Sequence, residues 1–282
     1  MSEVIRYHAR HIPVPCHSPG VSPMSLRASL LLPLLLCAPA AWAADAAADA
    51  AAMTSPWSGS GGELGFASAH GNSVTESLNA HLKLRYTDDD WVHSMDLFAL
   101  HSNAGYLTTD ANGDTVQRRQ TTANRFTASA GSALQLGEHR QLTATVRYEH
   151  DDFATYDRQG SFGLGYGTRL LDKDRATVDV QIGPGVRRMH NAVTDQSHTG
   201  LIGRGLLDAK FKITGNTSLV DTLLIESGSD NTFAQNDFGL VVAMNDRFAL
   251  KAGWQARYNS DVDVNKHKTD TLVTMNVVYN FK

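Results

Sequence analysis

The feature that most constrains the fold is a strict alternation of apolar and polar residues over long stretches of the chain. In 77–86, SLNAHLKLRY, an apolar residue occupies every second position, and 142–149 and 248–259 behave in the same way. A period of two places the apolar residues on one face of a β-strand, whereas a helix would spread them around its whole surface. These stretches are therefore predicted to be strands with one apolar and one polar face.

Turn residues interrupt the alternation and divide the chain into about twelve strands. Short breaks, such as 171–175 and 245–247, alternate with longer or more polar ones, such as 105–119 and 260–268. The strands are expected at 61–70, 74–86, 91–103, 118–135, 141–151, 158–170, 175–190, 198–213, 217–228, 232–244, 247–259 and 268–281. Long strands with alternating short and long connections predict an all-β fold, a transmembrane antiparallel β-barrel of about 12 strands.

A soluble antiparallel sandwich or lipocalin-like barrel would also alternate, with its apolar residues pointing inward. Two observations oppose this alternative. The expected strands are longer than the five or six residues that are usual in soluble sheets. The polar faces also carry small residues that suit a narrow interior, such as Gly163, Gly165 and Gly167.

Aromatic residues gather near the ends of the expected strands. On the side of the short turns we expect a membrane belt of Trp57, Tyr86, Trp91, Phe248, Tyr279 and Phe281, joined by Phe211. The opposite strand ends carry Tyr148, Phe153, Tyr156 and Tyr258. Two belts of aromatic rings at the lipid–water boundaries are typical of membrane barrels.

The chain closes on NVVYNFK, in which Val277, Tyr279 and Phe281 share one face. This ending resembles that of outer-membrane proteins in general, although most finish on the aromatic residue and here Lys282 follows it. The resemblance implies that the barrel assembly machinery recognises the last strand during insertion. Membrane lipid and lipopolysaccharide are the other partners that such a location implies.

The first part of the chain carries a predicted export signal. Residues 24–43 combine one basic residue, a short apolar run and the small-x-small pattern Ala41-Trp42-Ala43, which predicts a signal peptide cleaved after about Ala43. Export through a cleaved signal, together with the barrel strands, predicts a location in the outer membrane of a Gram-negative cell.

Three further segments complete the expected organisation. Residues 1–23 show no periodicity and are either an extended basic head or lie upstream of a true start at Met24. Residues 44–56 form an Ala-rich linker, and 57–282 form the β-barrel domain.

The bulk composition limits the partners and the chemistry. The net charge is −4, whereas nucleic-acid-binding proteins usually carry a positively charged surface. No nucleic acid is therefore expected as a partner. Cys16 and Cys37 both precede the expected cleavage point, so the mature chain would hold neither a disulfide nor a thiolate site. The sequence does not predict an oligomeric state.

The polar face of the expected strands carries charges of both signs. The residues expected to face the lumen are Lys83, Arg85, Arg125, Arg147, Glu149, Arg169, Asp179, Arg204, Asp208, Lys210, Lys251, Arg257 and Asp270. An Arg or Lys that faces lipid at mid-membrane costs roughly 2–4 kcal/mol, so these side chains should pair with one another or with water inside the barrel. Two interpretations stay open: a core filled by charge pairs, or a narrow wet passage whose charges filter solutes.

The strongest hint of an enzyme is LHSNAGY at 100–106. It resembles the His-x-Ser-Asn-Gly motif of outer-membrane phospholipases and lipid A deacylases, in which histidine and serine share one face of a strand. Here His101 and Ser102 are adjacent, and adjacent residues of a strand point to opposite faces. We therefore expect no enzyme and no catalytic residue.

Two acidic stretches, 110–114 and 261–265, carry alternate oxygen ligands as calcium loops do. Neither contains a complete calcium loop, and solvated loops explain both stretches better. The twelve histidines show no close metal pair. No metal site and no cofactor are expected.

The opening of the domain carries a recognisable pattern. A Gly-Glu-Leu-Gly-Phe strand at 62–66 is followed by Gly-Asn-Ser at 71–73 and by the alternating strand at 77–86. Together with QTTANRF at 120–126 and the closing TDTLVTMNVVYNFK, this pattern resembles the YdiY-like family, the salt-induced outer-membrane proteins. The resemblance implies an outer-membrane barrel, and the family label implies a link to salt or osmotic conditions.

The expected function is that of a non-enzymatic outer-membrane barrel of the salt-induced type, acting as a small channel in the cell envelope. The alternatives are a lipid-modifying hydrolase and a purely structural or adhesive barrel.

Overall fold

The computed structural model describes residues 55–69, 74–109, 113–264 and 266–281. The expected signal peptide, the segment before it, residues 44–54 of the expected linker, and Lys282 lie outside the described residues. In the described part of the chain, all the regular elements are β-strands. These residues contain no helix that is long and apolar enough to cross a membrane.

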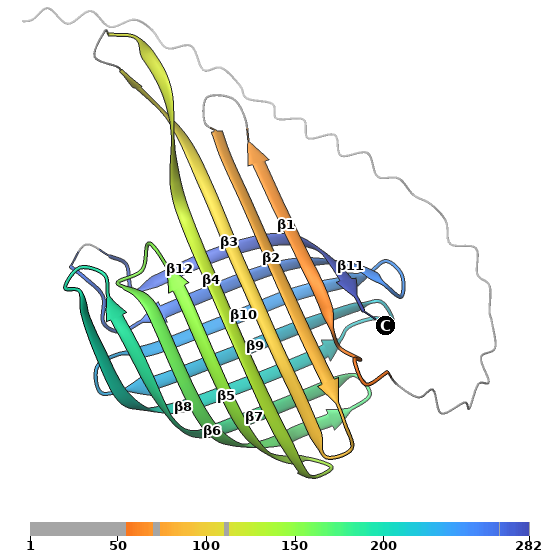
Figure 1. Cartoon of the computed structure of the whole chain (residues 1–282). Helices are drawn as coiled ribbons and strands as arrows, with labels where there is room; N and C mark the ends of the chain where they lie inside the picture. Colours follow the sequence, from red (N-terminus) through yellow and green to blue (C-terminus); the bar gives the residue numbers. More distant parts are fainter. Residues whose placement is uncertain (1–54, 70–73, 110–112, 265, 282) are drawn as a thin grey trace, which may run out of the picture. The chain divides into compact units, whose positions relative to one another are not determined.

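Twelve antiparallel strands form one closed sheet. They are β1 (Gly61–Ala69), β2 (Val74–Thr87), β3 (Trp91–Thr109), β4 (Thr115–Gly137), β5 (Arg140–Asp151), β6 (Tyr156–Lys173), β7 (Ala176–Asn191), β8 (Gln196–Lys212), β9 (Thr217–Gly228), β10 (Thr232–Ala243), β11 (Phe248–Asn259) and β12 (Thr269–Asn280). Each strand pairs with its neighbours in the chain, and β1 pairs with β12, which closes the barrel (Figure 1). The predicted barrel of 12 strands is confirmed.

One predicted boundary is wrong. The sequence indicates a long polar break at 105–119, but β3 continues to Thr109 and β4 begins at Thr115, so most of that stretch is a hairpin. The reason is its content of Tyr, Thr and Val, which favour extended structure, with a glycine at positive φ, Gly113, beside the turn. The β3–β4 hairpin consequently extends beyond the strands next to it (Figure 1).

The barrel is apolar outside and polar inside. Residues at every second position, such as Leu64, Ile182 and Val273, point outward and expose 64%, 64% and 75% of their surface. The intervening residues face the interior, where Arg147 and Glu149 are buried. This arrangement inverts that of a soluble barrel and matches the alternation of membrane barrels.

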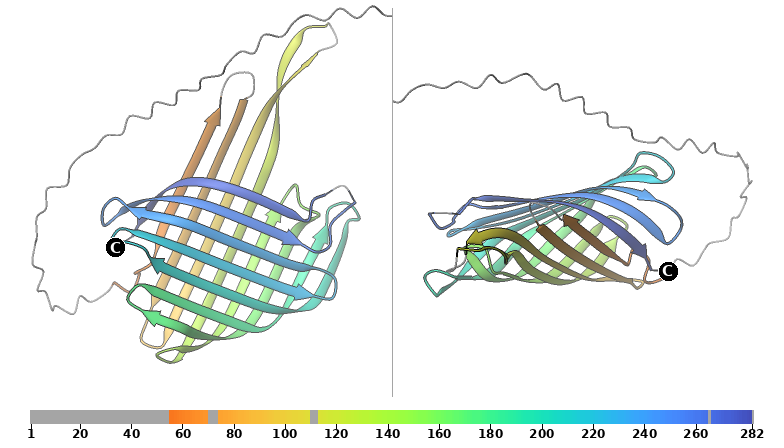
Figure 2. Two further views of the ribbon diagram at one scale, coloured as in Figure 1. Left: turned by 180° about the vertical axis from the view of Figure 1, so that it is seen from behind. Right: turned by 90° about the horizontal axis from the view of Figure 1, so that it is seen from above.

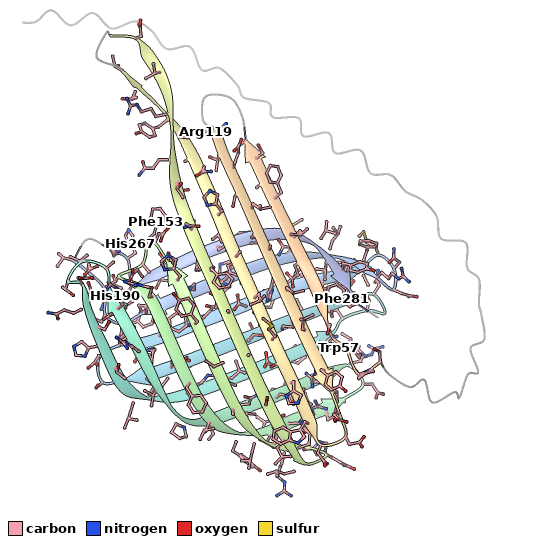
Figure 3. All side chains as sticks on the ribbon, viewed as in Figure 1. Trp57, Arg119, Phe153, His190, His267 and Phe281 are labelled. Carbon is pink, nitrogen blue, oxygen red and sulfur yellow. The ribbon has the colours of Figure 1, made fainter. Side chains whose placement is uncertain are left out.

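The two ends of the barrel differ in their connections. At one end, here called the turn end, short turns at 88–90 and 174–175 join the strands. The other end, here called the loop end, carries longer connections such as 260–268. Trp57 and Phe281 lie toward the turn end, whereas Phe153, His190 and His267 lie toward the loop end (Figure 3).

The strands form two facing walls. In Figure 2 the strands of the second half of the chain cross those of the first half at a large angle. The walls join at a short seam, because the pairing of β1 with β12 runs from Gly61 opposite Asn280 to Gly65 opposite Asn276. By comparison, β2 pairs with β3 from Val74 to Thr87.

Candidate functional site

A cluster of buried charged side chains occupies the loop-end half of the interior. We call it the interior ion cluster; it consists of Arg125, Arg147, Glu149, Asp151, Arg187, Arg204, Glu226 and Arg257. These residues lie on β4, β5, β7, β8, β9 and β11, at positions that alternate with the outward-facing apolar residues. Side chains from both walls therefore converge on one region of the lumen.

Glu149 is the centre of one half of the cluster. Its carboxylate accepts hydrogen bonds from Arg147 and from Arg257, and its side chain is only 1% exposed. Arg257 also donates to Asp151, with 2.9 Å between Nη1 and Oδ2. Because β5 and β11 are six strands apart in the ring of twelve, these bonds cross the lumen from one wall to the other.

Glu226 is the centre of the other half. Its side chain is fully buried, and its carboxylate accepts a hydrogen bond of 2.8 Å from the Ser161 hydroxyl. The Arg204 Nε lies 3.6 Å from Oε1, and the Arg187 Nη1 lies 3.8 Å from Oε2. Glu149 and Glu226 thus each face two guanidinium groups, an arrangement that compensates charge where water is scarce.

An aromatic ring lies against the guanidinium groups of both Arg147 and Arg257. Phe233 is fully buried, and its ring centroid lies 4.8 Å from the Arg147 guanidinium carbon and 5.5 Å from that of Arg257. Guanidinium groups stack favourably on aromatic faces because they are weakly hydrated and attracted by the ring. Phe233 therefore helps to fill the lumen as well as to orient the arginines.

A second polar group lies inside the seam. The Lys251 ammonium donates to Glu63 at 2.8 Å, which ties β11 to β1 across β12. His81 lies between Glu63 and Asp96, at 3.7 Å from the first carboxylate and 2.8 Å from the second. These contacts reinforce the closure of the barrel where the pairing of β1 with β12 is short.

The turn-end half of the interior is more open. By register Lys83, Arg85 and Lys210 point inward, yet all three are exposed. Arg169 donates to Asp179 at 2.9 Å, and both side chains are about one-third exposed. These charged, accessible side chains, here called the turn-end vestibule, lie on the turn-end side of the interior ion cluster.

The structure sorts the residues expected in the lumen into three groups, with Asp270 apart from them. Arg125, Arg147, Glu149, Arg204 and Arg257 belong to the interior ion cluster. Lys83, Arg85, Arg169, Asp179, Asp208 and Lys210 point into the vestibule. Lys251 belongs to the seam group, and Asp270 lies opposite Arg257 at the loop end, where it is exposed.

Several charged residues of the interior escaped the sequence analysis, namely Glu63, Asp96, Asp151, Arg187 and Glu226. Counting odd and even positions along each strand would have found most of them. Glu226, for example, faces inward by the same alternation that turns Ile225 outward. Arg187 is followed directly by Arg188, and because the two cannot share a face, the doublet alone does not indicate which of them lies inside.

The mouth at the loop end is crossed by the β11–β12 connection. We call residues 260–264 and 266–268 the mouth strap. The Lys266 ammonium donates to the Ala154 carbonyl at 2.7 Å, and the Asp263 amide donates to the Thr155 hydroxyl at 3.1 Å. These bonds join the β11–β12 connection to the β5–β6 turn on the opposite wall.

Aromatic residues lie at the turn end as outward-facing rings. Trp57 meets Tyr86 with 5.1 Å between ring centroids, and Tyr279 meets both Phe248 and Phe281. Trp91 is also exposed, by 42%.

One aromatic prediction for the opposite side is wrong. Tyr156, expected in the outer belt, is only 8% exposed, and its hydroxyl donates to Asp261 of the mouth strap at 2.6 Å. Its polar end therefore points to the mouth rather than to lipid.

The motif at 100–106 does not bring a nucleophile to a base. His101 lies opposite the outward-facing Leu78, whereas Ser102 lies opposite Ser77 on the inner face. Within residues 55–69, 74–109, 113–264 and 266–281, no group of three or more His, Cys, Asp or Glu side chains is placed to hold a metal ion.

A closed antiparallel barrel with an apolar exterior and a charged, hydrogen-bonded interior defines a β-barrel protein of the transmembrane class. More particularly, the chain belongs to the family described as "Protein of unknown function, DUF481", which matches residues 62–281. It is 23% identical to the uncharacterized protein YdiY of Escherichia coli (strain K12) over 217 residues, which cover 76% of this chain and 80% of YdiY. The YdiY-like resemblance is thereby confirmed.

Two solved structures to which the chain is similar are a porin and an outer-membrane channel. The NanC porin has a TM-score of 0.47 at 9% identity, with 79% of this chain and 98% of the porin covered. The COG4313 outer membrane channel from Pseudomonas putida F1 has a TM-score of 0.47 at 13% identity, with 83% and 100% covered. At this level of similarity the comparison concerns the fold alone.

Proposed function

We propose that this protein is a non-enzymatic channel of narrow bore in the outer membrane, closed in the described conformation by its interior ion cluster. The observation that carries the proposal is the contrast between the exposed, inward-facing charges at the turn end and the buried ion cluster beyond them, which we interpret as an entrance and a barrier. The vestibule supplies a wet, charged entrance from the turn end. The barrier consists of ion pairs that can separate without breaking the strand ladder, because they link side chains rather than backbone.

The barrier combines two layers along the proposed passage. The Arg257 contacts with Glu149 and Asp151 bridge the walls, and the mouth strap lies beyond them at the loop end. Fixed charges of both signs would disfavour large or apolar solutes and leave small hydrated ions as the expected cargo. The family label adds a proposed link to salt or osmotic conditions, which rests on resemblance.

The outer-membrane location is part of the proposal. It is supported by the apolar exterior and by the aromatic rings at the turn end, which suit a lipid–water boundary. Cell fractionation should recover the folded protein, in a heat-modifiable form, with outer-membrane markers. Recovery in the soluble fraction would refute this location.

Conductance across planar lipid bilayers tests the channel. The wild-type barrel should give small or brief current steps, and the double variant Glu149→Ser/Arg257→Ser should give larger or more frequent ones. The double variant removes one charge of each sign, so the net charge of the interior is unchanged while Arg147 and Asp151 each lose an ion-pair partner and the barrier is weakened. Arg119→Gln is the matched control, because its side chain is 61% exposed on the β3–β4 hairpin.

Each outcome separates the candidate functions. If wild type and double variant are both folded and neither passes current above that of lipid alone, the barrel has a structural role and the channel is refuted. An assay with mixed phospholipids and lipid A tests the hydrolase alternative. Activity that Ser102→Ala abolishes would refute the non-enzymatic assignment.

A further inference from the structure

The outer wall formed by β8–β11 carries a carboxylate among apolar side chains. Asp221 lies between Leu219 and Leu223 on the outward face of β9. Its neighbour Thr222 faces the interior, where the hydroxyl donates to Asp208 at 2.7 Å. Because successive residues of a strand alternate, Asp221 points away from the lumen and toward the lipid-facing side.

Asn236 on β10 points outward beside it. Its neighbours Gln235 and Asp237 are inward and bonded to each other at 2.6 Å. The Asn236 amide donates to the Asp221 carboxylate with 2.8 Å between Nδ2 and Oδ1. The polar ends of the two side chains therefore meet at one depth on the outer surface.

The residues directly opposite this pair on the neighbouring strands are apolar. Asp221 is paired across the strands with Ala209 and Phe238, and Asn236 with Leu223 and Ala256. A primary amide has two N–H donors and a carboxylate has about four acceptor positions. A single hydrogen bond between the two side chains therefore leaves an amide N–H and several carboxylate acceptor positions facing lipid. Lipid tails cannot form hydrogen bonds with them.

The outer face of β8 carries small residues. Ala209 lies directly opposite Asp221, and Gly205 and Gly203 follow farther along the strand toward the loop end. Gly203 and Gly205 on β8 point outward, and a Cβ at Gly205 would meet nothing within 4 Å. A larger side chain at Gly205 would thus be accepted by the barrel itself. Small residues on a lipid-facing surface allow a second protein surface to approach closely, as they do between membrane helices.

We propose that the outer face of β8–β11 docks a second copy of this chain, with the Asp221–Asn236 pairs of the two copies in contact. The pair is self-complementary, because each copy offers both a carboxylate and an amide. A two-fold axis along the membrane normal between β9 and β10 brings the four polar ends together, since those of one copy already lie at one depth. This inference rests on the membrane location proposed above.

Cysteine cross-linking in isolated outer membranes tests the interface. Leu223→Cys, placed beside the polar pair, should give a disulfide-linked dimer on mild oxidation. Leu164→Cys is the matched control, because it is also an outward-facing leucine, 53% exposed, but on β6. The wild-type chain measures any background from Cys16 and Cys37.

Adding Asp221→Leu and Asn236→Leu to the Leu223→Cys variant should lower the dimer yield at least tenfold. It should leave the barrel folded, because the two replacements suit a lipid-facing wall. A dimer yield from Leu223→Cys no higher than from Leu164→Cys overturns the interface. A yield unchanged by the leucine replacements overturns the role of the polar pair. A chain that is absent from the membrane fraction instead refutes the membrane location, and the docking surface with it.

Discussion

Replacing Glu149 by glutamine should destabilise the barrel strongly. The Glu149 side chain is 1% exposed, and its carboxylate is shared by Arg147 and Arg257. Removing one partner of a buried ion pair typically costs about 3–5 kcal/mol, because the remaining charge is left without compensation. Asp151 still holds Arg257 at 2.9 Å in the variant. We therefore expect a loss near the lower end, about 3 kcal/mol.

The free energy of unfolding can be measured by urea titration of the barrel in lipid vesicles, followed by tryptophan fluorescence and extrapolated to zero denaturant. The matched control is Arg119→Gln, which breaks the exposed contact of 3.2 Å with Glu76. Exposed pairs contribute about 0–1 kcal/mol, so the control should stay close to wild type. If Glu149→Gln loses no more stability than the control, the ion cluster does not hold the two walls together.

Three further variants test other parts of the structure. Tyr156→Phe removes the bond of 2.6 Å to Asp261 and should cost about 1–3 kcal/mol and lengthen the open events in bilayer recordings, because the mouth strap loses an anchor. Gly183→Ala should cost about 1–3 kcal/mol in urea titration, since its Cβ would lie 1.9 Å from a backbone oxygen of β6. Phe281→Ala should lower the yield of heat-modifiable protein in membranes, because the ring packs on the turn-end aromatic residues.

Controls make these three variants decisive. A Cβ at Gly160 would meet its nearest atom at 3.9 Å, so Gly160→Ala should be tolerated where Gly183→Ala is not. Equal losses would refute the steric explanation. Unchanged recordings for Tyr156→Phe would show that the mouth strap does not limit conduction, and full yield for Phe281→Ala would show that the last strand tolerates loss of its final ring.

The strand pattern could be predicted from the sequence because the two faces of each strand have different chemistry. A run such as 77–86 fixes both the secondary structure and the side that meets lipid, and neither depends on distant parts of the chain. The β3–β4 hairpin was missed for the complementary reason. Its residues extend beyond the strands next to it, where polar residues occur on both faces and the period of two carries little information.

The pairing inside the barrel could not be predicted from alternation. Parity assigns Glu149 and Arg257 to the interior, but it does not say that residues 108 positions apart meet across the lumen. That contact depends on the angle between the two walls and on the register of every strand between them. The separation into a buried cluster and an exposed vestibule depends on the same wall angle and strand register. For this reason the sequence alone did not distinguish a filled core from a wet passage.

Strand β9 shows why parity must be counted before a charge is interpreted. Asp221 and Glu226 are both acidic residues of one strand, and both could be taken for lumen residues. They are five positions apart, an odd number, so only one of them can face the interior. Glu226 does so and is compensated by Ser161 and two arginines. Asp221 faces outward with Asn236, and lipid cannot supply the partners that water or arginine would supply. A carboxylate therefore stabilises the barrel from the inside at Glu226, whereas at Asp221 it favours contact with a second protein surface.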